Sequence, residues 1–198
     1  MWDCGIIDHD IFVGRVVKIL ICYASTEGQT RKICRFCADQ IFALGHSVEM
    51  LGVSDAGDLE LAGFDAAVLA GSVHTGKVQR ELAEFAGAHA GALNRMATLF
   101  LQVSLAAAGD DEHEHADLRR IADEFCGGAG WTPDATHHIA GAFRFTQYDF
   151  FRSWAMRYIS ARKDRQVDPH ADTEFTDWSA LSGIMRDWTA SLSARQRP

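Results

Sequence analysis

Hydroxyl-bearing and small residues are concentrated in one short segment near the start of the chain, Ser25-Thr26-Glu27-Gly28-Gln29-Thr30. This segment follows an almost continuous apolar run at residues 16–23 and precedes a helical pattern of apolar residues. A loop that ends at a helix N-terminus presents free backbone N–H groups, and three hydroxyls add further donors. Gly28 allows a positive φ or a close approach to a ligand. The segment predicts a phosphate-binding loop, although an ordinary capped turn between a strand and a helix fits the same residues.

The residue types of this loop restrict which phosphate it can hold. The segment is not G-x-G-x-x-G, and it lacks the lysine of the G-x-x-x-x-G-K-[ST] loop, which disfavours a nucleoside triphosphate. Without a lysine, the phosphate charge must be balanced by hydrogen bonds and by the partial positive charge of the helix N-terminus. This arrangement suits a terminal phosphate monoester such as that of FMN.

Cysteines and histidines are the other candidates for chemistry, and we favour structural roles for them. Cys34 and Cys37 have C-x-x-C spacing, but they lie inside the predicted helix rather than at its N-terminus, so we expect buried core thiols. The acidic run 109–117 contains His113, Glu114 and His115, and we predict a solvated loop because no further ligands at zinc-site spacing follow.

Two adjacent histidines, His137 and His138, stand at the start of a predicted strand. Side chains alternate along a strand, so the two imidazoles face opposite sides of the sheet. This placement is more typical of hydrogen-bonded structural histidines than of a pair of acid–base catalysts.

Apolar runs and helical patterns alternate along the chain. The strands and helices that they predict must position these residues. Five strands are predicted, at residues 16–23, 46–53, 66–72, 97–104 and 136–143. Helical patterns are predicted at residues 33–44, where Gly45 follows as a C-cap, at 78–89, at 114–127, and at 178–192, which Thr176 or Asp177 caps. A small polar loop, Val73 to Lys77, is expected after the third strand. The alternation indicates a doubly wound parallel sheet, in which ligands bind beyond the carboxyl ends of the strands.

Composition limits the possible classes of protein. The chain has 198 residues, 47% of them hydrophobic and 23% charged, which suits a single domain at residues 16–194 with an N-terminal extension at 1–15. Nineteen basic residues against 27 acidic ones give a formal charge of −8, which argues against nucleic acid as a partner. The extension lacks the features of a secretory signal, and five cysteines without framework spacing fit reduced thiols. We therefore expect a cytoplasmic protein.

One segment, residues 143–165, departs from the acidic average. It holds six of the 19 basic residues, two of the 27 acidic ones and seven of the 20 aromatic ones, a net charge of +4. If residues 150–165 are helical, aromatic side chains share one face and arginines lie toward the other, as in a helix at a membrane surface. An amphipathic helix packed on the sheet has the same pattern.

Several segments resemble the flavodoxin family. ILICYASTEGQT, AGSVHTG and QVSL are similar to its three flavin-contacting loops, and WTPDATHHIAGAFRF and TEFTDW resemble the family of bacterial menaquinone-dependent protoporphyrinogen oxidases, which are relatives of the long-chain flavodoxins. The resemblance covers roughly residues 16 to 192. It implies FMN as cofactor and a five-stranded flavodoxin-like sheet in the order 2-1-3-4-5, with the aromatic and basic segment as an insertion.

The resemblance also implies positions for the cofactor site. The phosphate would be held by Ser25, Thr26, Glu27, Gly28, Gln29 and Thr30. One side of the isoalloxazine would be bordered by Ser72, Val73, His74, Thr75 and Gly76, and the other side by Ser104, Leu105, Ala106 and Ala107. Simple flavodoxins often have Thr at the position of Glu27 and an aromatic residue in the second loop, where His74 could substitute.

The implied activity is the FMN-dependent oxidation of protoporphyrinogen IX to protoporphyrin IX in haem biosynthesis, with menaquinone or ubiquinone as electron acceptor. Arg144, Arg152, Trp154 and Arg157 would contact the substrate or an anionic membrane, to which the protein would bind peripherally. Two alternatives stay open: a flavodoxin-type electron carrier, and an NAD(P)H:quinone reductase.

Overall fold

The computed structural model describes residues 16–143 and 173–195. Arg144, Arg152, Trp154 and Arg157 lie outside the described residues, as does the N-terminal extension. None of the helices in the two described ranges has an apolar stretch that would reach across a lipid bilayer.

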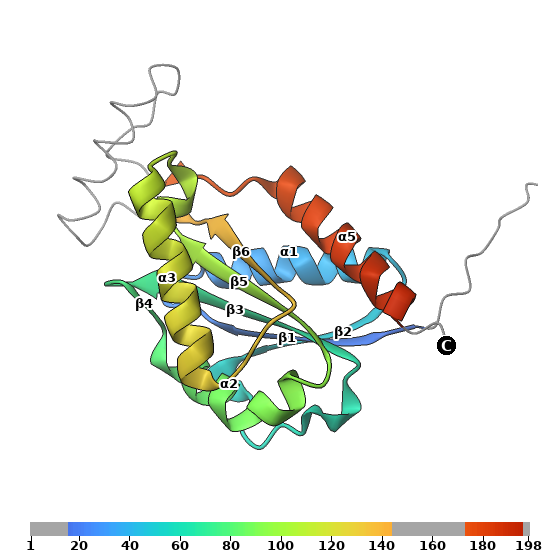
Figure 1. Cartoon of the computed structure of the whole chain (residues 1–198). Coiled ribbons are helices and arrows are strands. Elements are labelled where there is room, and N and C mark those ends of the chain that lie inside the picture. The colour runs from blue at the N-terminus through green and yellow to red at the C-terminus, as the bar shows by residue number, and fades with distance from the viewer. Residues whose placement is uncertain (1–15, 144–172, 196–198) are drawn as a thin grey trace, which may run out of the picture.

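Five parallel strands form the central sheet in the order β2-β1-β3-β5-β6, and the short β4 pairs antiparallel with the end of β3 (Figure 1). The strands are β1 (Lys18–Ala24), β2 (Ser47–Gly52), β3 (Ala66–His74), β4 (Lys77–Val78), β5 (Ala97–Ser104) and β6 (Ala135–Ala140). Counting the parallel strands alone, this is the order 2-1-3-4-5, so the sequence-based fold class is confirmed. β1, β3 and β5 are almost entirely buried because helices cover both faces.

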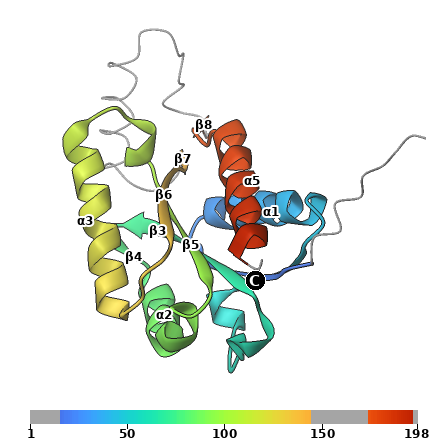
Figure 2. The same ribbon diagram turned by 45° about the vertical axis from the view of Figure 1, so that its right-hand side comes forward.

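Two helices cover each face of the sheet (Figures 1 and 2). Helices α1 (Gln29–Ala43) and α5 (Trp178–Arg195) lie on one face, and α2 (Arg80–Leu93) and α3 (Glu112–Ala129) lie on the other. Alternation along β1 supplies both cores, since Ile19 and Ile21 face α1 while Leu20 and Cys22 face α2. The three-layer arrangement leaves the loops at the strand ends open to solvent.

Helix α1 follows the predicted pattern. Ile33, Cys34, Cys37 and Ile41 are all fully buried against the sheet. The helix ends at Ala43, and Gly45 takes a φ of +86°, the left-handed conformation that commonly follows a helix C-terminus. The expectation of core thiols for Cys34 and Cys37 is therefore confirmed.

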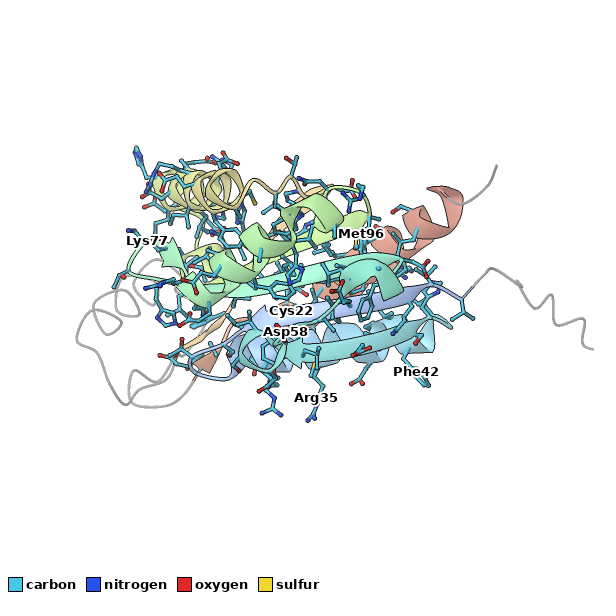
Figure 3. The ribbon with its side chains drawn as sticks, turned by 90° about the horizontal axis from the view of Figure 1, so that it is seen from below. Cys22, Arg35, Phe42, Asp58, Lys77 and Met96 are labelled. Carbon is cyan, nitrogen blue, oxygen red and sulfur yellow. The ribbon has the colours of Figure 1, made fainter. Side chains whose placement is uncertain are left out.

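The segment expected to be a polar loop, Val73 to Lys77, is instead a tight hairpin. β3 continues through His74, and Val73 pairs with Val78 in β4, so Val78 belongs to a strand rather than to the following helix. Thr75 and Gly76 form the two-residue turn with φ of +46° and +75°, the positive values that hairpin turns of this kind require. Lys77 lies at the end of the molecule opposite Met96, so the hairpin extends from the carboxyl edge of the sheet (Figure 3).

The acidic run 109–117 is mostly helical, which corrects the expectation of a solvated loop. Asp111 is the N-cap of α3, and its carboxylate accepts hydrogen bonds from the N–H groups of His113 and Glu114 at 2.8 and 3.4 Å. Acidic side chains are favoured in a first helical turn, because they meet the partial positive charge there. Among the described residues, no group of three His, Cys, Asp or Glu side chains is placed to hold a metal ion.

The C-terminal part of the chain returns to the carboxyl edge of the sheet. β7 (Ala142–Phe143) pairs with β8 (Thr173–Glu174), and α5 then packs along α1 (Figure 2). The ring centroids of Phe36 and Trp178 lie 4.9 Å apart across this helix pair. Of the two capping candidates, Asp177 accepts the N–H of Ala180 at 2.9 Å, whereas Thr176 bonds elsewhere.

Candidate functional site

Strand register brings the three predicted loops to one edge of the sheet. Ala24 lies opposite Gly71, Ser72 opposite Val103, and Ser104 opposite Ala140. The ends of these strands and the loops that follow them line a half-open cavity, as expected at the carboxyl ends of a doubly wound sheet. Its lining comprises Ser25, Glu27, Gln29, Thr30, Ser72, Val73, His74, Val103, Ser104, Leu105, Gly141 and Ala142.

The first loop is shaped around Gly28, which is the N-cap of α1 with φ +88°. Its N–H donates to Ser25 Oγ at 3.1 Å, and its carbonyl accepts the first helical hydrogen bond, from Lys32 N–H at 3.0 Å. The N–H groups of the three intervening residues therefore precede the helical ladder. No acidic residue stands in this first turn, so the positive end of the helix is available to an anion. The exposed Glu27 lies just before it.

Thr30 is the most buried residue of the first loop, with 2% of its surface exposed. Its side chain lines the cavity, and across the described part of the chain its hydroxyl has no hydrogen-bond partner. The hydroxyl oxygen keeps some exposed surface, so a ligand in the cavity can reach it. An anion at the α1 N-terminus would accept a hydrogen bond from this hydroxyl, so the donor set fits a phosphate.

A residue that the sequence analysis missed, Gln79, supports the second loop. Gln79 is the N-cap residue of α2, and its Nε2 donates to Ser72 Oγ and lies 3.5 Å from Thr26 Oγ1. The side chain thus links the first loop to the second. Its Oε1 is buried and has no partner within residues 16–143 and 173–195.

The third loop is held by its own serine and by Gly141. Ser104 Oγ accepts the N–H of Ala106 at 3.1 Å, and the Ser104 carbonyl accepts the N–H of Gly141 at 3.1 Å. A Cβ on Gly141 would approach Val103 Cγ1 to 3.3 Å, so this close passage of the backbone favours glycine. Gly141 was not among the sequence-based site residues, although it belongs to the quoted segment IAGAFRF.

Six of the fifteen expected cofactor positions do not line the cavity: Thr26, Gly28, Thr75, Gly76, Ala106 and Ala107. Gly28 shapes the first loop through its backbone hydrogen bonds, and Thr75 and Gly76 form the hairpin turn next to His74. Ala107 lines a neighbouring hollow together with residues of β8 and the start of α5. The other nine positions line this one cavity.

A polar pair of one buried and one half-buried side chain lies under α3, next to the third loop. Gln102, which is fully buried, holds its Oε1 2.5 Å from His138 Nδ1, and its Nε2 has no partner in the described part of the chain. Burial lowers the pKa of His138, and the nearby His115 and Arg119 act in the same direction. Burial also lowers the pKa of His137. Neither histidine lines the cavity.

The thiols near the first loop are unsuited to nucleophilic chemistry. Burial raises the pKa of Cys37 to about 12 and that of Cys22 to about 12, and it raises the pKa of Cys34 well above its ordinary value. A thiolate is the reactive form of cysteine, and these environments disfavour it.

Comparisons with known proteins agree with this fold. Protoporphyrinogen IX dehydrogenase (quinone) of Escherichia coli strain K12 is 26% identical over 171 residues, which are 86% of this chain and 94% of that protein. The protein of the same name from Leishmania major is 24% identical over 183 residues, 91% of this chain and 79% of that protein. A solved flavodoxin from Pseudomonas aeruginosa matches with a TM-score of 0.54 at 14% identity, over 89% of this chain and 99% of that one. A family model described as a flavodoxin domain matches residues 20–170, well over half of the chain, so the protein belongs to the flavodoxin domain family.

Proposed function

We propose that the cavity binds FMN. The terminal phosphate would lie at the N-terminus of α1, where it would accept hydrogen bonds from backbone N–H groups and from the hydroxyls of Ser25 and Thr30. No lysine or arginine lines the cavity among the described residues, so the helix end and the hydroxyls would balance the phosphate charge. The observation that supports this proposal is the hydroxyl of Thr30, which lines the cavity at the N-terminus of α1 and has no hydrogen-bond partner among the described residues.

The remainder of the cavity suits a planar, partly apolar ring. Val73 comes from the end of β3, Val103 from the end of β5 and Leu105 from the third loop, so that apolar side chains line the space. The titratable side chains of the described lining are Glu27 and His74. Bound FMN would supply the redox chemistry, and the chain would bind it, orient it and set the charge around it.

We infer that the protein oxidises protoporphyrinogen IX to protoporphyrin IX and passes the electrons to a quinone. Support comes from the two curated relatives, which carry the name of this activity and align along most of their length. The substrate would lose two electrons and two protons in each round. A quinone would take them up and become a quinol. The protein would therefore act as an oxidoreductase in haem synthesis.

The aromatic and basic segment 143–165 would serve the large substrate or the membrane that holds the quinone. Its arginines, Arg144, Arg152 and Arg157 among them, suit the propionates of a porphyrinogen or the anionic headgroups of a lipid surface, and Trp154 suits an apolar ring. These positions lie outside the described residues, and their roles rest on the sequence.

Anaerobic spectroscopy of the purified protein tests both parts of the proposal. After loading with FMN, the flavin absorbance should bleach when protoporphyrinogen IX is added and should return when a menaquinone analogue follows. Reduced nicotinamide in place of the porphyrinogen provides the comparison, because bleaching by NADH or NADPH alone would favour a quinone reductase. Failure to bind FMN would exclude the whole proposal, whereas bound FMN that the porphyrinogen does not reduce would exclude only the reaction.

An electron carrier of the flavodoxin type is the second candidate, because the structure superposes on flavodoxins over 89% of its length. A carrier would exchange electrons with a protein partner and would turn over no porphyrinogen. The same titration separates the two functions.

A further inference from the structure

Four segments of the chain are joined by hydrogen bonds around Phe175 and Thr176, just before α5. Thr176 Oγ1 donates to the carbonyl of Ala140 at 2.7 Å and accepts from Gln29 Nε2 at 2.9 Å. Next to it, the N–H of Phe175 donates to the carbonyl of Gly141 at 3.0 Å, and the N–H of Gly141 donates to Ser104. The first helical turn of α1, the end of β6, the third loop and the β8–α5 connection are thereby joined within a few ångströms.

The Thr176 side chain suits this junction, and an apolar side chain in its place would lose both hydrogen bonds. A hydroxyl has one proton to donate and lone pairs to accept with, and both functions are used here. Thr176 is 8% exposed, so water does not readily substitute for its partners. Gln29 lies 147 positions earlier in the sequence, so this contact depends on the complete fold.

The contact also determines what Gln29 presents to the cavity. Gln29 lines the cavity and is the first residue of α1, but its amide nitrogen is committed to Thr176. The nearby Lys32 is likewise turned toward the C-terminal segment, with its Nζ 2.5 Å from Glu174 Oε2 and 5.2 Å from the ring centroid of Trp178. The first turn of α1 therefore offers backbone N–H groups to an anion, while the side chains of Gln29 and Lys32 point to β8 and α5.

We propose that Thr176 is a positioning residue for the cofactor phosphate: by holding the Gln29 side chain, it fixes the first turn of α1 so that the backbone N–H groups face the phosphate. This inference rests on the proposed binding of FMN. Thr176 does not line the cavity and acts through Gln29. A group that is fixed before the ligand arrives does not have to be ordered on binding, which favours affinity.

The test compares the dissociation constants of FMN and riboflavin, measured by quenching of flavin fluorescence, in four variants of the full chain. Thr176→Val keeps the shape of the side chain and removes the hydroxyl, whereas Thr176→Ser keeps the hydroxyl. Gln29→Leu removes the other half of the contact. Glu174→Gln is the matched control, since it removes a partly exposed ion pair from the same segment and leaves the buried contact in place.

We expect Thr176→Val to weaken FMN roughly 3- to 10-fold, the range of one neutral hydrogen bond. Riboflavin, which has no phosphate, should lose clearly less. Thr176→Ser should restore FMN affinity to within about twofold of wild type, and Glu174→Gln should not lower it. In the double variant with Gln29→Leu, the effect of Thr176→Val should largely disappear, because the two changes interrupt one contact.

Unchanged FMN affinity in Thr176→Val, or equal losses for FMN and riboflavin, would overturn the positioning role. Thermal unfolding of each variant without flavin identifies a loss that is merely structural, which would also appear with riboflavin. A wild-type protein that binds neither flavin would overturn the proposed cofactor itself, and the inference with it. The first result is read from the variants and the second from the wild type, so the two failures are distinguishable.

Discussion

Replacing Thr30 by Val removes one hydroxyl from the lining of the cavity and keeps the branched shape of the side chain. In the protein without cofactor this hydroxyl has no partner within the described residues, so no hydrogen bond is lost. We expect the free energy of unfolding without flavin to change by less than about 0.5 kcal/mol, because no hydrogen bond within the described chain is broken and the shape of the side chain is kept. Folding and cofactor binding should therefore respond differently to the same substitution.

FMN binding should weaken, because a hydrogen bond to a charged phosphate is lost. Such bonds contribute about 1.5–3 kcal/mol. This free energy corresponds to a loss of affinity of roughly 10- to 150-fold. The dissociation constants of FMN and riboflavin, measured by fluorescence titration at fixed salt, are the assay, and the affinity for riboflavin should stay near that of wild type.

Thr98→Val is the matched control, since it makes the same chemical change at a buried threonine whose hydroxyl is bonded. Thr98 is 1% exposed, and its Oγ1 accepts the indole N–H of Trp131 at 3.2 Å. This variant should lose about 1–3 kcal/mol of stability, because a buried donor is left unpaired. It should keep FMN affinity, because Thr98 lies near the start of β5 and the cavity lies at its end. Wild-type FMN affinity in Thr30→Val, or equal losses for FMN and riboflavin, would refute the assignment of Thr30 to the phosphate.

Three further predictions concern other parts of the chain. Burial lowers the pKa of His138, so the unfolded chain takes up the proton more readily, and the free energy of unfolding should fall as the pH drops below about 6.5. Urea unfolding at pH 7.5 and 5.0 measures this fall. The free energy of unfolding should fall less in His138→Gln than in wild type, whereas the exposed control His113→Gln should fall as much as wild type. Equal falls in wild type and both variants would show that His138 is not the cause. Thr75→Asn should stabilise the hairpin by about 0.5 kcal/mol, since Asn tolerates the positive φ at this position better than Thr does. A lower melting temperature of the variant would show that the positive φ of Thr75 does not cost stability. Reversing the charge of Arg152 and Arg157 should release the protein from anionic vesicles in flotation assays, most clearly at low salt, and retained, salt-insensitive binding would count against the membrane role.

The main elements of the sheet could be predicted because burial on both faces requires continuous apolar sequence. Residues 97–104 were expected as a strand and form β5 with the same bounds, and residues 16–23 correspond closely to β1. The apolar stripe of α1 and the glycine that follows the helix could also be predicted. In each case a pattern within one short segment was enough for the prediction.

Two segments were wrongly expected to be loops for identifiable reasons. Val73 to Lys77 is a hairpin, but a two-residue turn between very short pairing segments contains the same small and polar residues as a loop. The acidic run 109–117 contains the first turns of α3, which face solvent and therefore lack an apolar stripe. The N-cap residue Asp111, with acidic residues directly after it, was the signal that could have shown this start.

The sequence predicted those parts of the site that lie in the connections between strands and helices. Ser25 to Thr30 and parts of the second and third loops come together because parallel strands end at one edge. Gln79 and Gly141 were missed, and Thr176 was expected only as a helix cap, because their roles depend on contacts between segments distant in the sequence. The quoted segments that contain Gly141 and Thr176 stood out by resemblance, but nothing local indicated what their side chains or backbone touch.

The buried cysteines of α1 supply a built-in reporter of local opening. Because the thiols of Cys34 and Cys37 are buried and resist ionisation, an alkylating reagent at neutral pH can reach them only when α1 separates from the sheet. A ligand at the N-terminus of that helix stabilises the closed form by RT ln(1 + [L]/Kd), so it slows their labelling by a factor of about 1 + [L]/Kd. The alkylation rate of Cys34 and Cys37, followed separately from the other free cysteines, would thus measure the affinity of the proposed FMN without any flavin signal, also in variants that bind flavin too weakly to observe directly.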